Sequence, residues 1–365
     1  MTVPNLTVAI LFGGRSSEHT ISCATAGGVL EAIDRSKYEI IPIGITCDGA
    51  FTLQEDDAAK FRMDPANMPT VHDNGTRILW PESALSRELR YLDADGELRS
   101  LGDVDLVFPL LHGPFGEDGT LQGLLELTGL PYVGNGLLAS ALAMDKHFTK
   151  NALAAAGVQV APWVTVTPQQ WERQRDLWVG RAHSLGLPAF VKPARAGSSV
   201  GVTKVNDWSE LDAALVVAFA EDKKALIESA VVGREIECGV LSGRDGGPTR
   251  VSLPGEIVMV GREFYDFEAK YIDPDSAQLI CPTELAEGEL RELQRVAARA
   301  FEAIDGSGLA RVDFFFTGTD FIVNEINTVP GFTPISMFPK CWLASGMSYP
   351  ELIDELIVLG LEAVR

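Results

Sequence analysis

Strand signals that alternate with helical patterns dominate the first third of the chain and constrain its fold more than any other feature. Three short apolar runs have the length and composition of strands, and they cover 7–12, 38–46 and 104–111. Apolar residues at helical spacing follow the first run over about 17–33 and the third over about 120–128. Such alternation is typical of a mostly parallel sheet. We therefore expect the chain to begin with an α/β domain.

The remainder of the chain is organised differently. Between 53 and 102 the periodicity fades, which predicts a loop-rich insertion with a short hairpin. A helix is expected over 137–156 and should end at Gly157. The strands expected beyond it cover 189–193, 200–205, 225–229, 235–241, 309–316 and 321–325. The length of 365 residues suits two or three domains.

Acidic residues outnumber basic ones by 51 to 30, so the formal net charge is −21. Such a surface repels nucleic acid and anionic membranes, and we expect neither as a partner. It does not exclude ATP, because local lysines, glycine-rich backbone and Mg²⁺ outweigh a distant field. Apolar runs of bilayer length, a signal-peptide pattern and paired cysteine motifs are all absent from the sequence. We expect a cytoplasmic protein with reduced thiols.

Two short polar patterns near the C-terminus carry the strongest chemical signal. Arg311 and Asp313 lie on one predicted strand and Glu325 and Asn327 on the next, so each pair shares a face of its strand. Hairpin pairing would collect two carboxylates, an amide oxygen and an arginine, a set that suits Mg²⁺ beside an anion. The alternative is the polar outer face of an amphipathic hairpin. The turn that follows favours the functional interpretation, because it can aim the Gly331 amide at the same point.

A second pattern runs from Lys192 to Gly201 and contains a loop of small residues between two predicted strands. Gly197 permits close backbone approach and Ser198 offers a hydroxyl, so the loop can lie over phosphates. It is not a Walker A loop, because the lysine comes first and no G-K-[ST] follows. Taken alone, the pattern more often belongs to a glycine-rich hairpin turn.

Glycine-rich turns also follow two of the strands predicted near the N-terminus. Gly13 and Gly14 lack the rest of the G-x-G-x-x-G pattern, which disfavours dinucleotide binding. Glu18 begins the next helix, where the helix dipole favours a carboxylate, and it could also hold a substrate ammonium. In the stretch 112–119, His112 and a Glu-Asp pair precede another helix. For this stretch a capping turn and a ligand-facing loop are both open.

Basic residues of interest lie far apart in the sequence. They are Lys146, Lys192, Arg195, Lys270 and Arg311. Their distribution predicts one phosphate site that several domains build together, rather than a local basic patch.

In their order along the chain, these motifs resemble those of the D-alanine–D-alanine ligase family. They cover 13–18, 112–119, 144–146, 192–201, 268–271, 311–313 and 325–331. The resemblance implies the mixed α/β (α+β) ATP-grasp fold, in which two antiparallel sheets hold ATP between them. It also implies an N-terminal α/β domain at 1–136, a central domain at 137–231 and a C-terminal domain at 232–365.

The resemblance further implies roles for single residues. The implied ATP contacts are Lys146, Lys192, Ser198, Glu228, Ala230, Val231, Glu235 and Lys270. The implied ligands of two Mg²⁺ or Mn²⁺ ions are Asp313, Glu325 and Asn327. The implied substrate contacts are Glu18 for the ammonium of the first D-alanine, His112, and Ser336 for the carboxylate of the second. Arg311 and the Gly331 amide would form an oxyanion site, and Ser198 and Tyr271 would hydrogen-bond with Glu18 across a closed lid.

The implied reaction joins two D-alanines through an acyl phosphate, for peptidoglycan synthesis, in a homodimer. Tyr271 favours the dipeptide, because the related D-alanine–D-lactate ligases often lack this tyrosine. Depsipeptide formation or another ATP-grasp carboxylate–amine ligation is the nearest alternative. A nucleotide-binding regulator would not need the pair of Arg311 and Gly331, and an oxidoreductase is disfavoured by the missing dinucleotide pattern.

Overall fold

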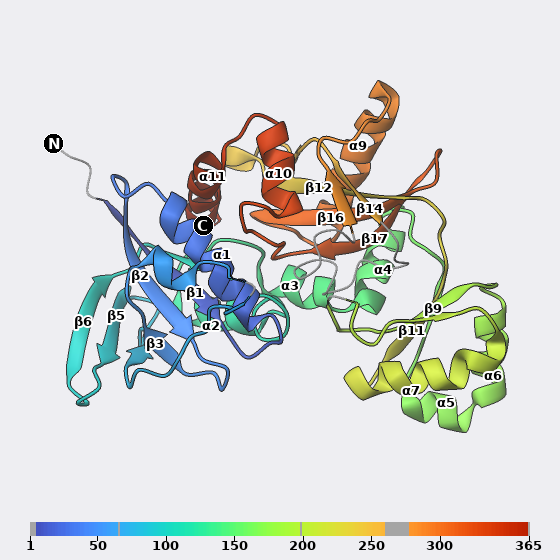
Figure 1. Ribbon diagram of the computed structural model, residues 1–365, viewed down its shortest axis with the longest axis horizontal. Coiled ribbons are helices and arrows are strands. Elements are labelled where there is room, and N and C mark those ends of the chain that lie inside the picture. Colours follow the sequence, from blue (N-terminus) through green and yellow to red (C-terminus); the bar gives the residue numbers. More distant parts are fainter. Residues whose placement is uncertain (1–4, 65, 198, 260–276, 364–365) are drawn as a thin grey trace.

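The computed structural model describes residues 5–64, 66–197, 199–259 and 277–363, which form four sheets and the helices around them (Figure 1). The N-terminal sheet has the order β3-β2-β1-β7. Its strands are β1 (Leu6–Gly13), β2 (Tyr38–Ile45), β3 (Phe51–Leu53) and β7 (Leu106–Pro109). β1 pairs in parallel with β2 and β7, which confirms the expected parallel core of this sheet.

Two helices follow the strands of this sheet at their carboxyl ends. They are α1 (His19–Ala32) after β1 and α2 (Thr120–Thr128) after β7. Both agree with the predicted helices within two residues at the observed ends. The turns that lead into them, at 13–18 and 110–119, therefore open at the same edge of the sheet, where α/β proteins usually place ligands.

The region between 53 and 102 is more regular than predicted. It contains η1 (Ala58–Phe61) and an antiparallel sheet of β4 (Arg77–Leu79), β5 (Glu88–Leu92) and β6 (Leu98–Asp103). The predicted short hairpin is confirmed by β5 and β6, whereas β4 and η1 were not predicted because these elements bury little. Ile78 and Leu89 are the buried residues of the three strands, and most of β6 is exposed, so the sequence shows almost no alternation.

The central sheet is antiparallel, with the order β10-β9-β11-β8. Its strands are β8 (Trp163–Val166), β9 (Ala189–Pro193), β10 (Thr203–Val205) and β11 (Ala225–Ser229). The nearby helices are α5 (Pro168–Arg173), α6 (Arg175–His183), η2 (Trp208–Glu210) and α7 (Leu211–Glu221), on one side of the sheet in Figure 1. β10 begins three residues later than predicted, because Val200 lies in a turn.

The helix predicted over 137–156 is two helices, α3 (Leu137–Met144) and α4 (Lys146–Ala155). The break is at Asp145, whose backbone is extended and whose carboxylate accepts hydrogen bonds from the His147 and Phe148 amides. Asp145 thus caps α4, which gives the helix a new direction at Lys146. Gly157 follows the end of α4 with φ = 71°, as predicted for this position.

The C-terminal sheet has the order β15-β14-β12-β16-β17, with β13 paired to β12. Its strands are β12 (Arg234–Leu241), β13 (Arg250–Val251), β14 (Gly255–Met259), β15 (Ala277–Ile280), β16 (Leu309–Phe316) and β17 (Phe321–Asn327). η3 (Arg244–Gly246) lies between β12 and β13. On one face, alternate residues such as Ile236, Val312 and Ile326 pack against α9 (Glu287–Ala303), α3 and α4. The opposite face carries the polar residues of the candidate site.

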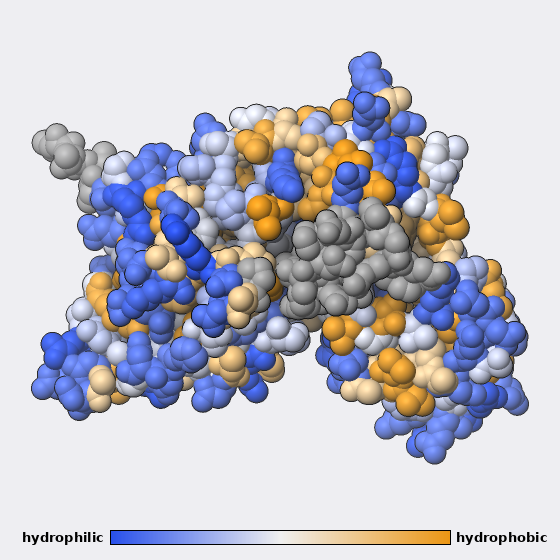
Figure 2. Space-filling view, in the orientation of Figure 1, coloured by the Kyte–Doolittle hydropathy of each residue, from blue (hydrophilic) through white to orange (hydrophobic). Residues whose placement is uncertain are grey.

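The last two helices connect the C-terminal sheet to the first one. They are α10 (Met337–Ala344) and α11 (Tyr349–Glu362). α10 packs on the polar face of the sheet, where a Cβ at Gly239 would lie 2.5 Å from the Trp342 indole nitrogen. Leu352 and Leu356 of α11 join Ile10 of β1 in one core. The central sheet instead has a core of its own, and Figure 2 shows a notch between the lobe with β4–β6 and the lobe with α5–α7.

Candidate active site

Three adjoining cavities lie between these sheets, and each shares lining residues with the next. The middle cavity is lined by Glu18, His112 and Glu117 from the N-terminal part and by residues of α4 and β17. A larger cavity of about 300 Å³ shares Lys146 and Glu325 with it. A third cavity, of about 110 Å³, shares Arg311 and Gly331 with the middle one. The large and the third cavity also share Glu237 and Ile257, so ligands in the three cavities would all be neighbours.

The hairpin of β16 and β17 forms the common wall of these cavities. Asp313 pairs directly with Glu325 and Arg311 with Asn327, so the predicted four side chains do gather on one face. A bulge follows at once, because Phe314 pairs with Val323 and leaves Asn324 as the extra residue. Bulges of this kind commonly redirect side chains beside active sites.

Arg311 is held on this wall by two carboxylates. Its Nε and one Nη donate to Asp313 at 2.7 Å each, and Nε lies 3.0 Å from Oε2 of Glu237. Burial disfavours the charge of Arg311, but Asp313 and Glu237 outweigh that cost and keep its pKa above the ordinary value. Sequence reasoning missed Glu237, which lies on β12 directly opposite Asp313.

Around the same carboxylates the donor set suits a hard divalent cation. The Asn327 amide donates to Asp313 at 2.9 Å, and Lys146 Nζ lies 3.7 Å from Glu325. The carboxylates of Asp313 and Glu325 and the amide oxygen of Asn327 then face one space. These oxygens are the ligand types that Mg²⁺ prefers. Within the described ranges, no three His, Cys, Asp or Glu side chains form a cluster that could hold a metal. A cation here would need further oxygens from its ligand, as Mg²⁺ takes from nucleotide phosphates.

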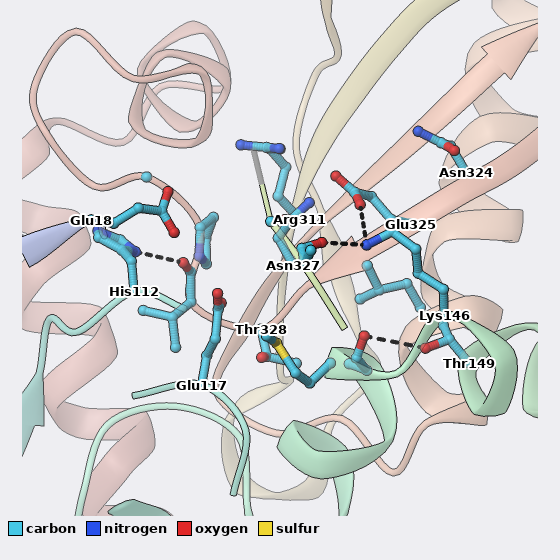
Figure 3. Close-up of a pocket in the computed structure, with 18 residues that line it drawn as sticks. Glu18, His112, Glu117, Lys146, Thr149, Arg311, Asn324, Glu325, Asn327 and Thr328 are labelled. Atoms are coloured by element: carbon cyan, nitrogen blue, oxygen red, sulfur yellow. Dashed lines mark hydrogen bonds and ion pairs between the residues drawn. The ribbon is translucent and has the colours of Figure 1, made fainter. Parts of the chain in front are cut away.

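The opposite wall of the middle cavity comes from the N-terminal part. Figure 3 shows Glu18, His112 and Glu117 on one side of the cavity and Glu325 on the other. His112 Nδ1 lies 3.1 Å from the Val329 carbonyl, so it carries the proton, and its buried Nε2 has no hydrogen-bond partner in the described part of the chain. Burial lowers the pKa of His112, which leaves the ring neutral with an accepting nitrogen.

The stretch 112–119 contains both a turn that leads into α2 and a side chain that faces the middle cavity. Asp118 precedes Gly119, the residue before α2, and accepts hydrogen bonds from the amides of Phe115 and Thr120. Glu117 faces the cavity and accepts a hydrogen bond from the Gly113 amide at 2.7 Å. Burial, and then the charge of Glu18, raise the pKa of Glu117 to about 8. The turn therefore leads into α2 and also presents a carboxyl group to the middle cavity.

The large cavity lies between β9–β11 and the C-terminal sheet. Lys192, Glu228, Val231 and Glu235 line it, as does Asp313. Lys192 Nζ donates to Oε1 of Glu228 at 2.7 Å.

Two further features of this end were not anticipated. The buried Lys150 contacts the other oxygen of Glu228, also at 2.7 Å. The Ala230 amide donates to the Pro188 carbonyl and is thus engaged within the protein.

The loop after β9 reaches the middle cavity. The Lys146 ammonium donates to the Ala196 carbonyl at 2.8 Å, which ties this loop to α4. A Cβ at Gly197 would lie 3.7 Å from Oε2 of Glu18, so the loop and Glu18 are adjacent. Arg195 instead pairs with Asp222 and does not line the three cavities.

The third cavity combines polar and apolar side chains. Ser336 lies at the start of α10, and its hydroxyl is 2.7 Å from that of Thr333. A Cβ at Gly331 would lie 3.2 Å from the Ser336 hydroxyl oxygen, so the two positions are close. Met63, from the region between 53 and 102, lines the same cavity as Ile335. That region thus contributes to the site, which the sequence did not indicate.

Comparison with known proteins decides the family. A profile described as D-ala D-ala ligase N-terminus matches residues 7–135, and one described as D-ala D-ala ligase C-terminus matches residues 152–358. The chain belongs to the D-alanine–D-alanine ligase family. It is therefore an ATP-using ligase with the ATP-grasp fold, and the predicted family and fold are confirmed.

Relatives in this ligase family match over nearly the whole chain. A D-alanine–D-alanine ligase of Arthrobacter sp. (strain FB24) is 51% identical over 97% of this chain and 94% of its own length. The ligase of Streptomyces avermitilis is 50% identical, with the same two coverages.

Solved structures of the family agree with this. The VanG D-Ala:D-Ser ligase of Enterococcus faecalis has a TM-score of 0.84 and 35% identity, over 98% of this chain and 100% of its own. The D-alanine–D-alanine ligase of Coxiella burnetii has a TM-score of 0.78 and 34% identity, over 99% and 95%.

Three residues that the ligase resemblance singled out lie outside the described residues. They are Ser198, Lys270 and Tyr271. The helices in the described ranges include none that is long and apolar enough to cross a bilayer.

Proposed function

We propose that the protein joins two molecules of D-alanine into D-alanyl-D-alanine, with ATP as the activating substrate, for peptidoglycan precursor synthesis. One observation carries the proposal: three cavities that adjoin one another meet at the β16–β17 wall. Lys146 and Glu325 line both the large and the middle cavity, and Arg311 and Gly331 line both the middle and the third. A reaction that passes a phosphoryl group to one substrate and then an acyl group to another needs such neighbouring sites.

ATP is assigned to the large cavity. Its proposed contacts are Lys146, Lys192, Ser198, Glu228, Ala230, Val231, Glu235 and Lys270. The proposed ligands of two Mg²⁺ or Mn²⁺ ions are Asp313, Glu325 and Asn327. When bound, these ions neutralise negative charge on the ATP phosphates. The two lysines near the middle cavity, Lys146 and Lys192, would add fixed positive charge to the same end of ATP.

The first D-alanine is assigned to the middle cavity. Glu18 would bind its ammonium, and the accepting Nε2 of His112 suits a second contact with it. Arg311 would hold the carboxylate, since its contacts with Asp313 use Nε and one Nη and leave other donors of the fork. Ser198 and Tyr271 would close over Glu18 and exclude water, because acyl phosphates hydrolyse.

The second D-alanine is assigned to the third cavity, where Ser336 would bind its carboxylate. A carboxylate oxygen of the first D-alanine attacks the γ-phosphorus of ATP, which releases ADP and leaves an acyl phosphate. The amine of the second D-alanine then attacks the acyl carbon, and inorganic phosphate leaves. The tetrahedral oxyanion would form where Arg311 and the Gly331 amide meet, at the junction of the two cavities.

The second substrate is D-alanine rather than D-lactate or D-serine in this proposal. The relatives at 50% identity are named D-alanine–D-alanine ligases, whereas the D-Ala:D-Ser ligase is 35% identical. The proposal includes a cytoplasmic homodimer and a division into domains at 1–136, 137–231 and 232–365.

Product analysis tests this function. The protein is incubated with Mg-ATP and D-alanine, with L-alanine, or with D-alanine plus D-lactate or D-serine, and ADP release and product mass are recorded. We expect ADP and D-alanyl-D-alanine from D-alanine alone, and no product from L-alanine. A mixed product as the main species would overturn the assignment of the third cavity, and no ADP under any condition would overturn the function.

A further inference from the structure

Lys150 is buried behind the large cavity. It lies on α4 one turn after Lys146, and 2% of its side chain is exposed. Its ammonium is 2.7 Å from Oε2 of Glu228 and 5.6 Å from the centre of the Trp163 ring. Burying a lysine is costly unless the charge is paired, so this contact with Glu228 fixes the position of both groups.

Glu228 is held between two lysines, of which only one lines the large cavity. Lys192 binds Oε1 from β9 and lines the cavity, whereas Lys150 binds Oε2 from α4 and does not line it. A phosphate in the cavity can therefore compete with Glu228 for Lys192. Lys150 has no such competitor and can keep its contact with Glu228 when nucleotide is bound.

We propose that Lys150 is a positioning residue for nucleotide selection, which keeps the Glu228 carboxylate ionised and oriented when Lys192 turns towards the ATP phosphates. The inference rests on the proposed placement of ATP in the large cavity, with its adenine beside Glu228. An ionised carboxylate only accepts hydrogen bonds, so it suits the exocyclic amino group of adenine and disfavours the carbonyl at the same position of guanine.

The charges around Glu228 support this role. Burial alone would raise the pKa of Glu228, but Lys192 and Lys150 together bring it below the ordinary value. The remaining charged neighbour is Lys146, which acts on Lys150 from the preceding turn of α4. If Lys150 is removed and Lys192 binds phosphate, no lysine contacts Glu228, and the cost of burying its negative charge is no longer offset. Glu228 would then take up a proton as the pH falls, and its hydroxyl could donate to guanine.

The test is steady-state kinetics of Lys150→Met in the full chain between pH 6 and 9, with ATP and with GTP. The KM for ATP should rise about tenfold, the loss expected for one charged hydrogen bond. The kcat and the KM for D-alanine should change by less than about threefold, because Lys150 lines none of the three cavities. The preference for ATP over GTP should decrease, and most at low pH, whereas a general loss of stability would not depend on the base.

Three further variants complete the test. Lys224→Met removes another largely buried lysine, whose partner Asp145 caps the same helix. It should leave the ATP-to-GTP ratio and its pH profile unchanged. Lys150→Arg keeps the positive charge, so its ATP-to-GTP ratio should not depend on pH. If Lys150→Met fails to fold, the double variant Lys150→Met, Glu228→Gln removes the unpaired charge and should show the same loss of preference for ATP.

The outcomes separate this inference from the proposed function. An unchanged ATP-to-GTP ratio and pH profile in Lys150→Met, with ligase activity intact, would overturn the role of Lys150 alone. Equal increases in KM for ATP and D-alanine would also overturn it, because they would mark a general distortion. Absence of ADP release by the unmodified protein would overturn the proposed function instead.

Discussion

Two clusters of charged side chains flank the large cavity, and their balance of charge differs. At the hairpin end, the three carboxylates of Glu237, Asp313 and Glu325 face two cations, Arg311 and Lys146, so one negative charge is in excess. At the β9–β11 end, two lysines hold the single carboxylate of Glu228, so one positive charge is in excess. The contacts also differ, since both lysines lie 2.7 Å from Glu228 whereas Lys146 lies 3.7 Å from Glu325.

This difference shows what each end is suited to bind. Carboxylates that outnumber their cationic partners can accept a divalent cation, which supplies the missing positive charge. At the other end the close buried pairing holds the Glu228 carboxylate in place without ligand, with Lys192 lining the cavity and Lys150 behind it. The carboxylate end should therefore be sensitive to loss of any acid, and the lysine end to loss of nucleotide contacts.

The largest expected effect is that of Glu325→Ala. It removes a carboxylate that we assign to the metal ions, and kcat should fall by at least about 10³-fold. The melting temperature should change by no more than a few degrees, because Glu325 is half-buried. Asp320→Ala is the matched control, since this exposed carboxylate lies in the turn of the same hairpin and should leave kcat within about twofold. Near-normal turnover in Glu325→Ala would remove the metal assignment.

Arg311→Lys should have the next largest effect. The substitution keeps the charge between Asp313 and Glu237 but loses the planar fork that binds two groups at once. We expect kcat to fall by about 10²-fold while the KM for ATP changes little. Measuring kcat and both KM values at saturating co-substrate checks this. An effect confined to the KM for ATP would place Arg311 at the wrong end of the cavity.

Glu117→Gln tests whether the carboxyl group on the opposite wall of the middle cavity carries a proton. The carboxyl of Glu117 has a pKa of about 8 in the folded protein, against 4.5 for an ordinary glutamate. Between these values the folded state keeps a proton that the unfolded state loses, so this group makes stability fall as the pH rises. Between pH 5 and 8, the melting temperature of the glutamine variant should fall less than that of the unmodified protein.

The exposed Glu172→Gln on α5 is the control for this comparison and should follow the unmodified protein. Parallel melting curves for Glu117→Gln and the unmodified protein across pH 5 to 8 would contradict the protonated state of Glu117.

The smallest effect is expected for Ser336→Ala. This hydroxyl belongs to neither charged end, and its loss removes one hydrogen bond to the second D-alanine. The KM for that substrate should rise about three- to tenfold, with kcat and the KM for ATP nearly constant. Initial rates over a wide range of D-alanine concentrations separate the two D-alanine sites. A larger change at the first site would place Ser336 beside the other substrate.

The sequence predicted the β16–β17 wall well, because the geometry of a strand determines which side chains share a face. Residues two apart on a strand share a face, so Arg311, Asp313, Glu325 and Asn327 could be gathered before any coordinates were known. Glu235 and Glu237 also lie two apart on β12, but nothing in the sequence pairs this strand with the hairpin, so Glu237 was not singled out. Its neighbour Asp313 is 76 positions away, and only the sheet order brings the two strands together.

Three other differences depend on tertiary contacts. The motif at 144–146 includes Asp145 but does not show its capping contact, so the break between α3 and α4 was not predicted. Lys150 was not singled out in the sequence, and its burial against Glu228 appears only in the structure. The weak pattern of β4, β5 and β6 reflects how little these strands bury besides Ile78 and Leu89. Tertiary contacts, rather than local preference, decided all three.

The most direct test of the central claim follows the oxygen atoms of D-alanine. The protein is given Mg-ATP and D-alanine that carries ¹⁸O in both carboxylate positions, and the released inorganic phosphate is analysed by mass spectrometry. If ATP activates the carboxylate as an acyl phosphate, each dipeptide formed should be accompanied by one ¹⁸O in phosphate. Phosphate without ¹⁸O, at the same yield of dipeptide, would contradict the acyl-phosphate route and the assignment of substrates to the three cavities.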